Sequence, residues 1–368
     1  MKFGLRSTYF VLRTSYFVLC SCLLLGCNKY LEVDTGRPDV EPTAKGELIP
    51  VFAAGDYNDN LLGGTRALPA GFSIYDPTEV TNIDIFLGSN TAETQRGTFT
   101  NATGRWRSDL AVENGQVIYI YGLLPKEACV DARVAPLEGS MTNGVVMTLE
   151  GLSPLSTTDV CVIVGVRQGD SRKLPITEIE DLRQGQFSYT GRSAGEGNYV
   201  YLLLNHIYAS LGFQFRVDAT YSELRTIVLK KVELSTSSAS AATATVTLKS
   251  NNGGEDPIQS VTWAKTDGSK EITIFDETDG QTLTTSFADL NDCVFANLIN
   301  GDITMRCTYD VYDKAGNLTR GDAVSENKLP PMTIANRGER TRLRLTVNPT
   351  YLYVLSDADL DNPTLTIE

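Results

Sequence analysis

The stretch Asp302–Tyr312, DITMRCTYDVY, places an apolar side chain at every second residue. Side chains along a β-strand alternate between the two faces of a sheet, so this period of two predicts a strand with one buried face. The residues that follow include Asp313 and the pair Gly316-Asn317, types that tolerate the backbone conformation of a tight turn. The stretch therefore predicts one arm of a β-hairpin.

The same alternation recurs along most of the chain, and helical periodicity is poor almost everywhere. The other predicted strands are Glu47–Ala53, Glu79–Leu87, Gln116–Tyr121, Val160–Val166, Tyr199–Leu204, Phe213–Val217, Thr226–Leu234, Ala244–Leu248, Glu271–Phe275, Arg342–Val347 and Tyr351–Leu355. Gly, Asn, Asp and Pro separate them, which is typical of antiparallel β-sandwiches. We therefore expect an all-β protein with two β-sandwich domains, residues 46–224 and 225–368.

The composition excludes several classes of function. The chain has 368 residues, with 32 Lys and Arg against 45 Asp and Glu, for a net charge of −13. Such a surface repels phosphate, so we expect no nucleic acid partner. A single histidine excludes zinc sites of the HExxH type, and no CxxC pair has zinc-finger spacing. No GxSxG or GxGxxG motif stands between a predicted strand and helix, so we expect neither an enzyme nor a cofactor.

Residues 1–26 have the pattern of an export signal. Three cations and no acid accompany the apolar run Tyr16–Leu25, which matches a signal-peptide core and is too short for a transmembrane helix. The run ends in Leu24-Leu25-Gly26-Cys27, which looks like a bacterial lipobox. We expect a lipid on Cys27 to hold the protein on a membrane, with residues 27–45 as a flexible tether. The alternative is an ordinary cleaved signal with an incidental cysteine.

Several short pieces, in order along the chain, carry a resemblance to a known family. They are the lipobox at Cys27, the strand Glu47–Ala53, the loop with Thr65-Arg66-Ala67, the strand Glu79–Leu87, Trp106 followed by Tyr119–Pro125 (YIYGLLP), the stretch Asn205–Phe213 and the closing Pro349–Leu355. Together they resemble the fimbrillin family, the lipoprotein pilus subunits of Bacteroides-like bacteria. The resemblance implies sandwiches of transthyretin-like or immunoglobulin-like Greek-key topology, and polymerisation by exchange of a strand between neighbours.

The first predicted strand has features that strand exchange requires. Pro50 cannot donate a ladder hydrogen bond, so this strand should lie at a sheet edge. Its departure would open a groove where four apolar side chains had been: Leu48, Ile49, Val51 and Phe52. Losing three or four large buried side chains costs about 5–10 kcal/mol, comparable with the stability of a whole domain. The groove would therefore need refilling.

A protease site is predicted in the glycine-rich segment that follows this strand. Residues 56–71 have the character of an exposed loop that proteases cut, and Arg66-Ala67 is the expected site for an Arg-specific protease. Arg37-Pro38 is not expected to be cut, because proline after the scissile bond blocks most such enzymes. The alternative is that Arg66 is one solvated arginine among many.

The carboxy-terminal segment is the candidate filler of such a groove. Five consecutive residues would place apolar side chains on both faces of a strand: Tyr351, Leu352, Tyr353, Val354 and Leu355. Strand addition uses main-chain hydrogen bonds for affinity and alternate side chains for specificity. The alternative is a central strand of the second sandwich, and we favour a donor role for part of residues 350–368.

The last residues also offer a weak calcium pattern. Acids fall at positions 1, 3, 5 and 12 of an EF-hand-like loop, namely Asp357, Asp359, Asp361 and Glu368. Asn362 stands where the loop needs glycine, Pro363 follows it, and no predicted helices flank the segment. A polar turn before a last strand is therefore the preferred interpretation.

The remaining chemistry-bearing residues have structural interpretations. His206 lies in an apolar alternating stretch, where a lone histidine usually packs and bonds to backbone. Trp106 and Trp263 are of a type that stacks on sugars, although a place in the core is commoner.

Four cysteines lie within the two predicted domains. In an exported protein Cys129 could bridge to Cys161, and Cys293 to Cys307, but free buried thiols are equally compatible with the sequence.

Taken together, these features predict a structural subunit of a cell-surface fimbria, exported as an outer-membrane lipoprotein precursor and serving adhesion. Protease-triggered donor-strand exchange would polymerise it, so the expected partners are neighbouring subunits, an Arg-specific protease and, before cleavage, the membrane. Adhesion further implies a ligand on a host or bacterial surface. Two alternatives stay open: a monomeric glycan-binding lipoprotein of immunoglobulin-like modules, and a pilus anchor that is never cut.

Overall fold

The described part of the chain is built almost entirely of β-strands. The computed structural model describes residues 47–56, 58–59, 72–74, 82–89, 94–102, 105–169, 174–192, 198–251, 254–295, 302–329, 337–351 and 358–367. These residues form an all-β fold with a few short helical turns, which confirms the predicted fold class. The Greek-key topology and the two-domain layout stay predictions. Within the described ranges, no helix has the length and apolar character needed to cross a membrane.

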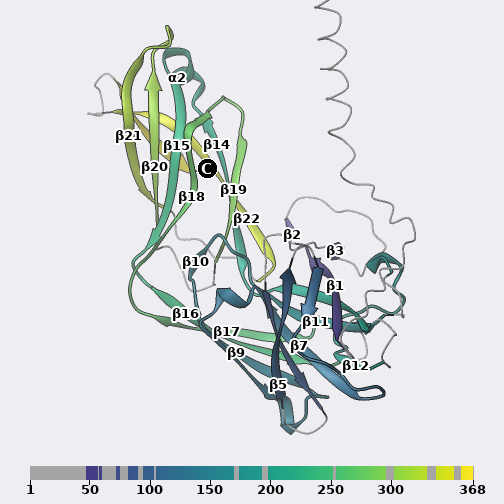
Figure 1. Cartoon of the computed structure of the whole chain (residues 1–368). Coiled ribbons are helices and arrows are strands. Elements are labelled where there is room, and N and C mark those ends of the chain that lie inside the picture. Colours follow the sequence, from purple (N-terminus) through teal and green to yellow (C-terminus); the bar gives the residue numbers. More distant parts are fainter. Residues whose placement is uncertain are drawn as a thin grey trace, which may run out of the picture. The chain divides into compact units, whose positions relative to one another are not determined.

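Two sheets contribute to the first core, which is the larger cluster of buried apolar side chains (Figure 1). Among the described strands, one sheet has the order β3-β1-β13-β11-β7-β4-β5-β6 with β12 beside β7, and the other the order β17-β16-β9-β8. Their bounds are β1 (Leu48–Gly55), β3 (Phe72–Ile74), β4 (Asn82–Gly88), β5 (Thr94–Ala102), β6 (Arg105–Ser108), β7 (Val117–Leu124), β8 (Asp131–Pro136), β9 (Gly144–Leu152), β11 (Cys161–Gln168), β12 (Ser188–Thr190), β13 (Asn198–His206), β16 (Ala241–Lys249) and β17 (Ile258–Thr266).

Two further sheets contribute to the second core. Their described strands have the orders β10-β19-β14-β22-β2, with β23 beside β22, and β18-β15-β20-β21. The bounds are β2 (Asn58–Asp59), β10 (Leu155–Ser156), β14 (Ala209–Val217), β15 (Thr226–Thr236), β18 (Lys270–Thr282), β19 (Ala288–Phe295), β20 (Ile303–Tyr312), β21 (Leu318–Lys328), β22 (Glu339–Tyr351) and β23 (Ala358–Ile367). A short helix, α2 (Ala219–Leu224), connects β14 to β15, and the described 3-10 turns are η1 (Lys126–Ala128), η2 (Leu137–Gly139) and η3 (Ile176–Glu178).

Alternation of apolar residues decides which face of each strand is buried. In β20 every second side chain from Ile303 to Val311 is buried, as the opening stretch of the sequence predicts. In β15 the buried residues include Leu229 and Val232, which are three apart rather than two. The register shifts between Leu229 and Lys231 there, and the extra residue of such a bulge returns the apolar side chains to the core face.

The centre of the first sheet is covered on both faces. In β13 all residues except Asn205 are buried, because β1 and β11 flank this strand and side chains cover both of its surfaces. Gly122, within the Tyr119–Pro125 segment, lies opposite Ile85 of β4. A Cβ there would come 2.5 Å from the Asp84 carbonyl oxygen, so only glycine permits this close approach of β7 to β4.

The chain passes between the two cores more than once. β14 contributes Leu211 and Phe213 to the second core although it precedes residue 225, and β10 contributes Leu155. Conversely, β16 pairs with β9 and contributes Val246 and Leu248 to the first core although it follows residue 225. A single boundary between 224 and 225 therefore does not separate the two cores.

Candidate functional site: the first and last strands

Strand β1 has a full ladder on one side and a short ladder on the other (Figure 1). It runs parallel to β13, with Leu48–Ala54 opposite Asn198–Leu204. On its other side β3 is antiparallel and covers only Ala53–Gly55. Over Leu48–Phe52, β1 therefore pairs with β13 alone among the described strands. Pro50, which has no N–H to donate, lies in this stretch.

One face of β1 is built into the first core. Leu48 is 0% exposed and Phe52 is 4% exposed, and the Phe52 ring meets Trp106 of β6 edge to face, with centroids 5.2 Å apart. Ile49 and Val51 point to the opposite face and are partly buried against the same core. All four residues predicted for the displaced strand therefore pack on apolar neighbours.

Polar contacts hold both ends of β1. At its start Glu47 accepts from the Arg107 guanidinium at 3.2 Å. At its end the Gly55 carbonyl oxygen lies 2.6 Å from Nε2 of His206, the last residue of β13. The ring of His206 is buried, and its Nδ1 contacts the Asp159 carboxylate. The predicted interpretation of His206 as a packed residue that bonds to backbone is confirmed.

Strand β23 occupies the side of β22 away from β14. Residues 345–351 of β22 pair antiparallel with β23, while residues 340–347 pair parallel with β14. Three apolar residues alternate at the end of β23: Pro363 and Leu365 are buried, and Ile367 is partly buried against the second core. Among the described strands, β22 is the ladder partner of β23, so β23 lies at an edge.

The five residues predicted as the donor strand are only partly described. Tyr351 is the last residue of β22, and Leu352, Tyr353, Val354 and Leu355 lie outside the described residues. Within residues 350–368, the segment for which we favour a donor role, most of the described residues belong to β23. The apolar alternation that a donor strand requires is thus found at Pro363–Ile367.

The acids of the weak calcium pattern are not seen together. Asp357, Glu368 and the side chain of Asp359 lie outside the described residues. The Asp361 carboxylate accepts hydrogen bonds from Arg225 Nε and Thr319 Oγ1, both at 3.0 Å. Burial acts to raise the pKa of Asp361, but these two hydrogen bonds outweigh it and lower the pKa below its ordinary value. In the fold Asp361 fastens β23 to β21 and to Arg225, the residue between α2 and β15.

Two predicted processing sites lie outside the described residues. They are the lipidation site Cys27 and the cleavage site Arg66-Ala67. Both stay predictions. The order of the chain nevertheless gives a cut at Arg66 a definite consequence, because β1 and β2 precede it and β3 is the first described strand after it.

The cysteines that the structure describes are free thiols: Cys129, Cys161 and Cys307. Burial raises the pKa of Cys129 to about 11 and that of Cys307 to about 12, so both are protonated at neutral pH. The side chain of Cys293 lies outside the described residues. Of the two alternatives that the sequence left open for Cys129 and Cys161, a bridge or free thiols, the structure shows free thiols.

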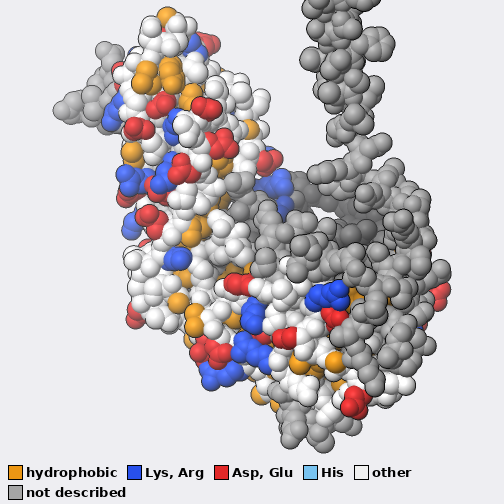
Figure 2. Space-filling model, in the orientation of Figure 1, with side chains coloured by type: hydrophobic (Ala, Val, Ile, Leu, Met, Phe, Trp, Pro, Cys, Tyr) orange, Lys and Arg blue, Asp and Glu red, His pale blue; other side chains and the backbone are white. Residues whose placement is uncertain are grey.

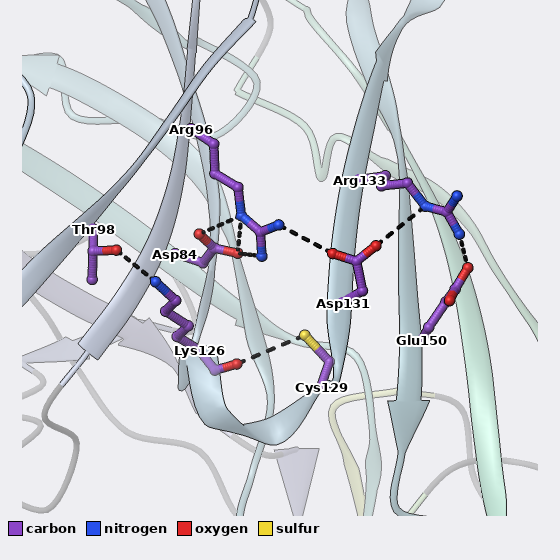
Figure 3. A network of polar contacts seen from close by, with 8 residues as sticks. All are labelled: Asp84, Arg96, Thr98, Lys126, Cys129, Asp131, Arg133 and Glu150. Carbon is purple, nitrogen blue, oxygen red and sulfur yellow. Dashed lines mark hydrogen bonds and ion pairs between the residues drawn. The ribbon is translucent and has the colours of Figure 1, made fainter.

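A chain of ion pairs joins the two sheets of the first core (Figure 3). Asp84 of β4 is fully buried, and Arg96 of β5 donates to it from Nε and Nη2 at 2.7–3.1 Å. Arg96 also reaches Asp131 of β8, and Arg133 continues the chain to Glu150 of β9. The side-chain hydrogen bond that Arg96 donates to Asp84 is the main reason why the pKa of Arg96 is raised above its ordinary value.

A polar cleft of about 430 Å³ lies beside this network. The residues that line it include Arg96, Lys126, Asn82 and Glu127, and none of them is aromatic. Sugars usually bind against an aromatic ring. The two tryptophans are elsewhere: Trp106 packs on Phe52, and Trp263 stacks on Tyr208 with centroids 5.5 Å apart.

Sequence reasoning missed the polar partners that tertiary structure assembles. Asp84 stands in the apolar run of β4, and a charged residue in a buried strand is a signal that a partner such as Arg96 must exist. Nothing local in the sequence links His206 to Gly55, which precedes it by 151 residues.

The chain is similar to solved structures of fimbrial and cell-adhesion proteins. A "putative cell adhesion protein" from Bacteroides fragilis aligns over 88% of this chain and 97% of its own, at 10% identity and a TM-score of 0.42. A fimbrial protein from Bacteroides vulgatus aligns over 78% and 91%, at 11% identity and a TM-score of 0.34. The fimbrial anchor protein Mfa2 from Porphyromonas gingivalis aligns over 88% and 97%, at 10% identity and a TM-score of 0.28.

No family model and no curated protein matches the sequence. The TM-scores to the solved structures are low, so these similarities carry no argument about function.

Proposed function

We propose that this chain is a structural subunit of a cell-surface fimbria, assembled by exchange of β1 for a strand of a neighbouring copy. The observation that carries the proposal is the place of β1, which is built into the first core and yet lies wholly before Arg66. A cut after Arg66 would leave β1 attached by non-covalent contacts alone.

The energetics of β1 explain why a replacement strand would be required. Leu48 and Phe52 are the large side chains on its buried face, and burial of each is worth about 1.5–3 kcal/mol. Their loss would expose the Trp106 ring and the row of β13 residues opposite β1. A second strand with alternating apolar residues restores both the ladder and the apolar contacts.

Strand β23 supplies the matching pattern. β1 places Leu48, Pro50 and Phe52 on its buried face, and β23 alternates Pro363, Leu365 and Ile367 in the same way. β23 also ends the described chain at a sheet edge, so it can leave β22 without passing other strands. We therefore place the donor role in β23 rather than in residues 351–355.

Two further parts of the proposal, the lipid anchor and the protease cut, are based on the sequence alone. A lipid on Cys27 would hold the precursor at the outer membrane until an Arg-specific protease cuts after Arg66. The role is structural rather than catalytic. Figure 2 shows acidic and basic side chains interspersed over the described part of one face, which suits contact with other proteins better than with nucleic acid.

The test is digestion of the full chain with an Arg-specific protease, followed by intact mass and particle size. We expect loss of the segment up to Arg66 and growth of the remainder into polymers visible by electron microscopy. Arg66→Ala should stay uncut at this site and monomeric. A chain lacking residues 358–368 should be cut but fail to polymerise.

Other outcomes would decide against the proposal. If the chain is cut after Arg66 and remains monomeric, it does not assemble by strand exchange and the proposal is wrong. A chain that is assembled into fimbriae without any cut, with Arg66→Ala equal to the wild type, would instead be an anchor subunit.

A further inference from the structure

Three side chains of different chemistry converge where β11 begins and β13 ends. Cys161 is the first residue of β11 and pairs across the sheet with His206. The Cys161 sulfur lies 3.4 Å from His206 Nδ1 and 3.7 Å from Asp159 Oδ2, and these last two atoms are in contact with each other. Among the residues that the structure describes, this is the one group of three such side chains whose ligand atoms lie together.

The other nitrogen of His206 fixes what Nδ1 can do. Nε2 lies 2.6 Å from the Gly55 carbonyl oxygen, which can only accept a hydrogen bond, so Nε2 carries the proton. In the neutral ring the Nδ1 lone pair then faces a carboxylate and a sulfur. Histidines that bind metals are oriented in this way, with the second ring nitrogen donating to a carbonyl or carboxylate.

We propose that Asp159, Cys161 and His206 bind a zinc ion. Thiolate sulfur, imidazole nitrogen and carboxylate oxygen are the ligands that zinc takes in proteins, and sulfur distances of 3.4 and 3.7 Å suit two ligands of one tetrahedral ion. Nδ1 and the carboxylate oxygen must move slightly apart to admit it. Cys161 and His206 are buried and the Asp159 side chain is 30% exposed, so a fourth ligand, water, would approach from the Asp159 side.

Binding exchanges protons for the metal. Burial raises the pKa of the Cys161 thiol well above its ordinary value, so without metal the sulfur keeps its proton. Zinc coordination deprotonates a thiol outright, so binding releases the Cys161 proton. The charge of the ion then compensates the thiolate and the carboxylate together.

The site has a consequence for β1 that rests on the proposed function. Zinc on Nδ1 would lock the ring whose Nε2 donates to Gly55 at the end of β1. A bound ion should therefore slow the departure of β1 from the cut chain. The binding of zinc itself requires neither cleavage nor assembly.

The test uses the full chain, freed of metal with a chelator and then titrated with zinc chloride. We expect one zinc per chain by calorimetry and elemental analysis. Cobalt(II) in place of zinc should give thiolate-to-cobalt charge-transfer absorption. Cys161→Ser should abolish that absorption. It should also weaken zinc binding by at least about 10–100-fold, the loss typical when a residue that only supports a metal ligand is removed.

Cys307→Ser is the matched control, because Cys307 is also a buried free thiol but lies in the second core. It should bind zinc and cobalt as the wild type does. Absence of stoichiometric zinc on the wild-type chain would overturn the proposal, as would an unchanged cobalt spectrum in Cys161→Ser. Should Cys161→Ser fail to fold, the wild-type cobalt spectrum and stoichiometry decide by themselves.

A failed zinc titration with normal protease-triggered assembly would refute the metal site alone. Normal zinc binding without any assembly would refute the proposed function alone. If the chain both binds zinc and assembles after cleavage, the peptide up to Arg66 should leave the cut chain more slowly with zinc than with chelator. Size-exclusion chromatography measures this release.

Discussion

Strands β1 and β23 both lie near sheet edges, and different forces hold them in place. On β1, Leu48 and Phe52 are almost fully buried, and contacts from Arg107 and His206 fasten its two ends. Among the described side chains of β23, Leu365 is the buried apolar one of comparable size, and it is 8% exposed. Among the described side chains, β1 buries two large apolar residues, whereas β23 combines the burial of Leu365 with the hydrogen bonds that Asp361 accepts.

This difference suits the proposed roles, in which β1 leaves after a cut and β23 fills the groove of a neighbouring copy. Apolar burial involves no charge that salt can screen or acid can neutralise, whereas a partly exposed ion pair is weakened by salt and by protonation of its carboxylate. In β23 the Asp361 carboxylate accepts hydrogen bonds from Arg225 and Thr319. We therefore expect β1 to resist conditions that loosen β23.

The largest effect should follow Phe52→Ala. Deleting a buried phenylalanine costs about 3–5 kcal/mol, and here it also removes the edge-to-face contact with Trp106. Urea unfolding followed by tryptophan fluorescence measures this loss directly, because both tryptophans pack on the first core.

Ile49→Val is the control for Phe52→Ala on the other face of β1. Ile49 is only partly buried, so its cost should be at the low end of about 0.5–1.5 kcal/mol. If the two variants lose equal amounts of unfolding free energy, the packing of Phe52 against Trp106 does not hold the strand in place.

A smaller effect is expected for Leu365→Ala in β23. Leucine-to-alanine changes in cores cost about 2–5 kcal/mol, and a site at a sheet edge belongs at the low end. Unfolding followed by circular dichroism should record the loss, and the tryptophan signal of the first core should shift less. Thr366→Ser, at an exposed position beside it, should have no measurable effect, and an effect as large as that of Leu365→Ala would contradict the assigned facing of β23.

Asp361→Asn should lower stability by less than about 1 kcal/mol. The Arg225 and Asp361 side chains are 21% and 43% exposed, and such pairs are weakened by solvent and salt. The difference in unfolding free energy between wild type and variant should shrink as sodium chloride is added. A difference that grows with salt would exclude an ion pair as the cause.

The smallest effect is the pH dependence of that same contact. The pKa of Asp361 is lower in the fold than in the unfolded chain, so its contribution is fully present above the unfolded value of about 3.9. It is lost as the pH falls through the lowered folded value. Unfolding curves at pH 6 and pH 3 should show wild type and Asp361→Asn converging at the acid end, and parallel curves would contradict the assignment.

Much of the fold could be predicted because alternation is a local property. Every second residue of β20 and β16 is apolar, and the structure buries those residues. The strand predicted at Tyr199–Leu204 lies within β13, although the cover on both of its faces was not predicted from the sequence. The features of the candidate site that could be predicted were of this kind, such as the apolar side chains of β1 and the packing of His206.

Partners could not be predicted, since they depend on residues far apart in the chain. The period of two in β16 does not state that its neighbour is β9, in the first core, rather than a strand of the second. Nor does the sequence of β1 state that it pairs with β13, about 150 residues later, in parallel. The proposal of a donor role for β23 depends likewise on its edge position, which is a property of the sheet and not of the strand's own sequence.

The sequence by itself determined that this is an all-β chain and which side chains of most strands face a core, because local periodicity fixes the facing of a strand. Tertiary structure alone decided that β1 lies between β13 and a short β3, that Asp84 meets Arg96, and that Asp159, Cys161 and His206 share one place. These contacts arise when distant segments bury their apolar faces together, and side chains that were unrelated along the chain then become neighbours.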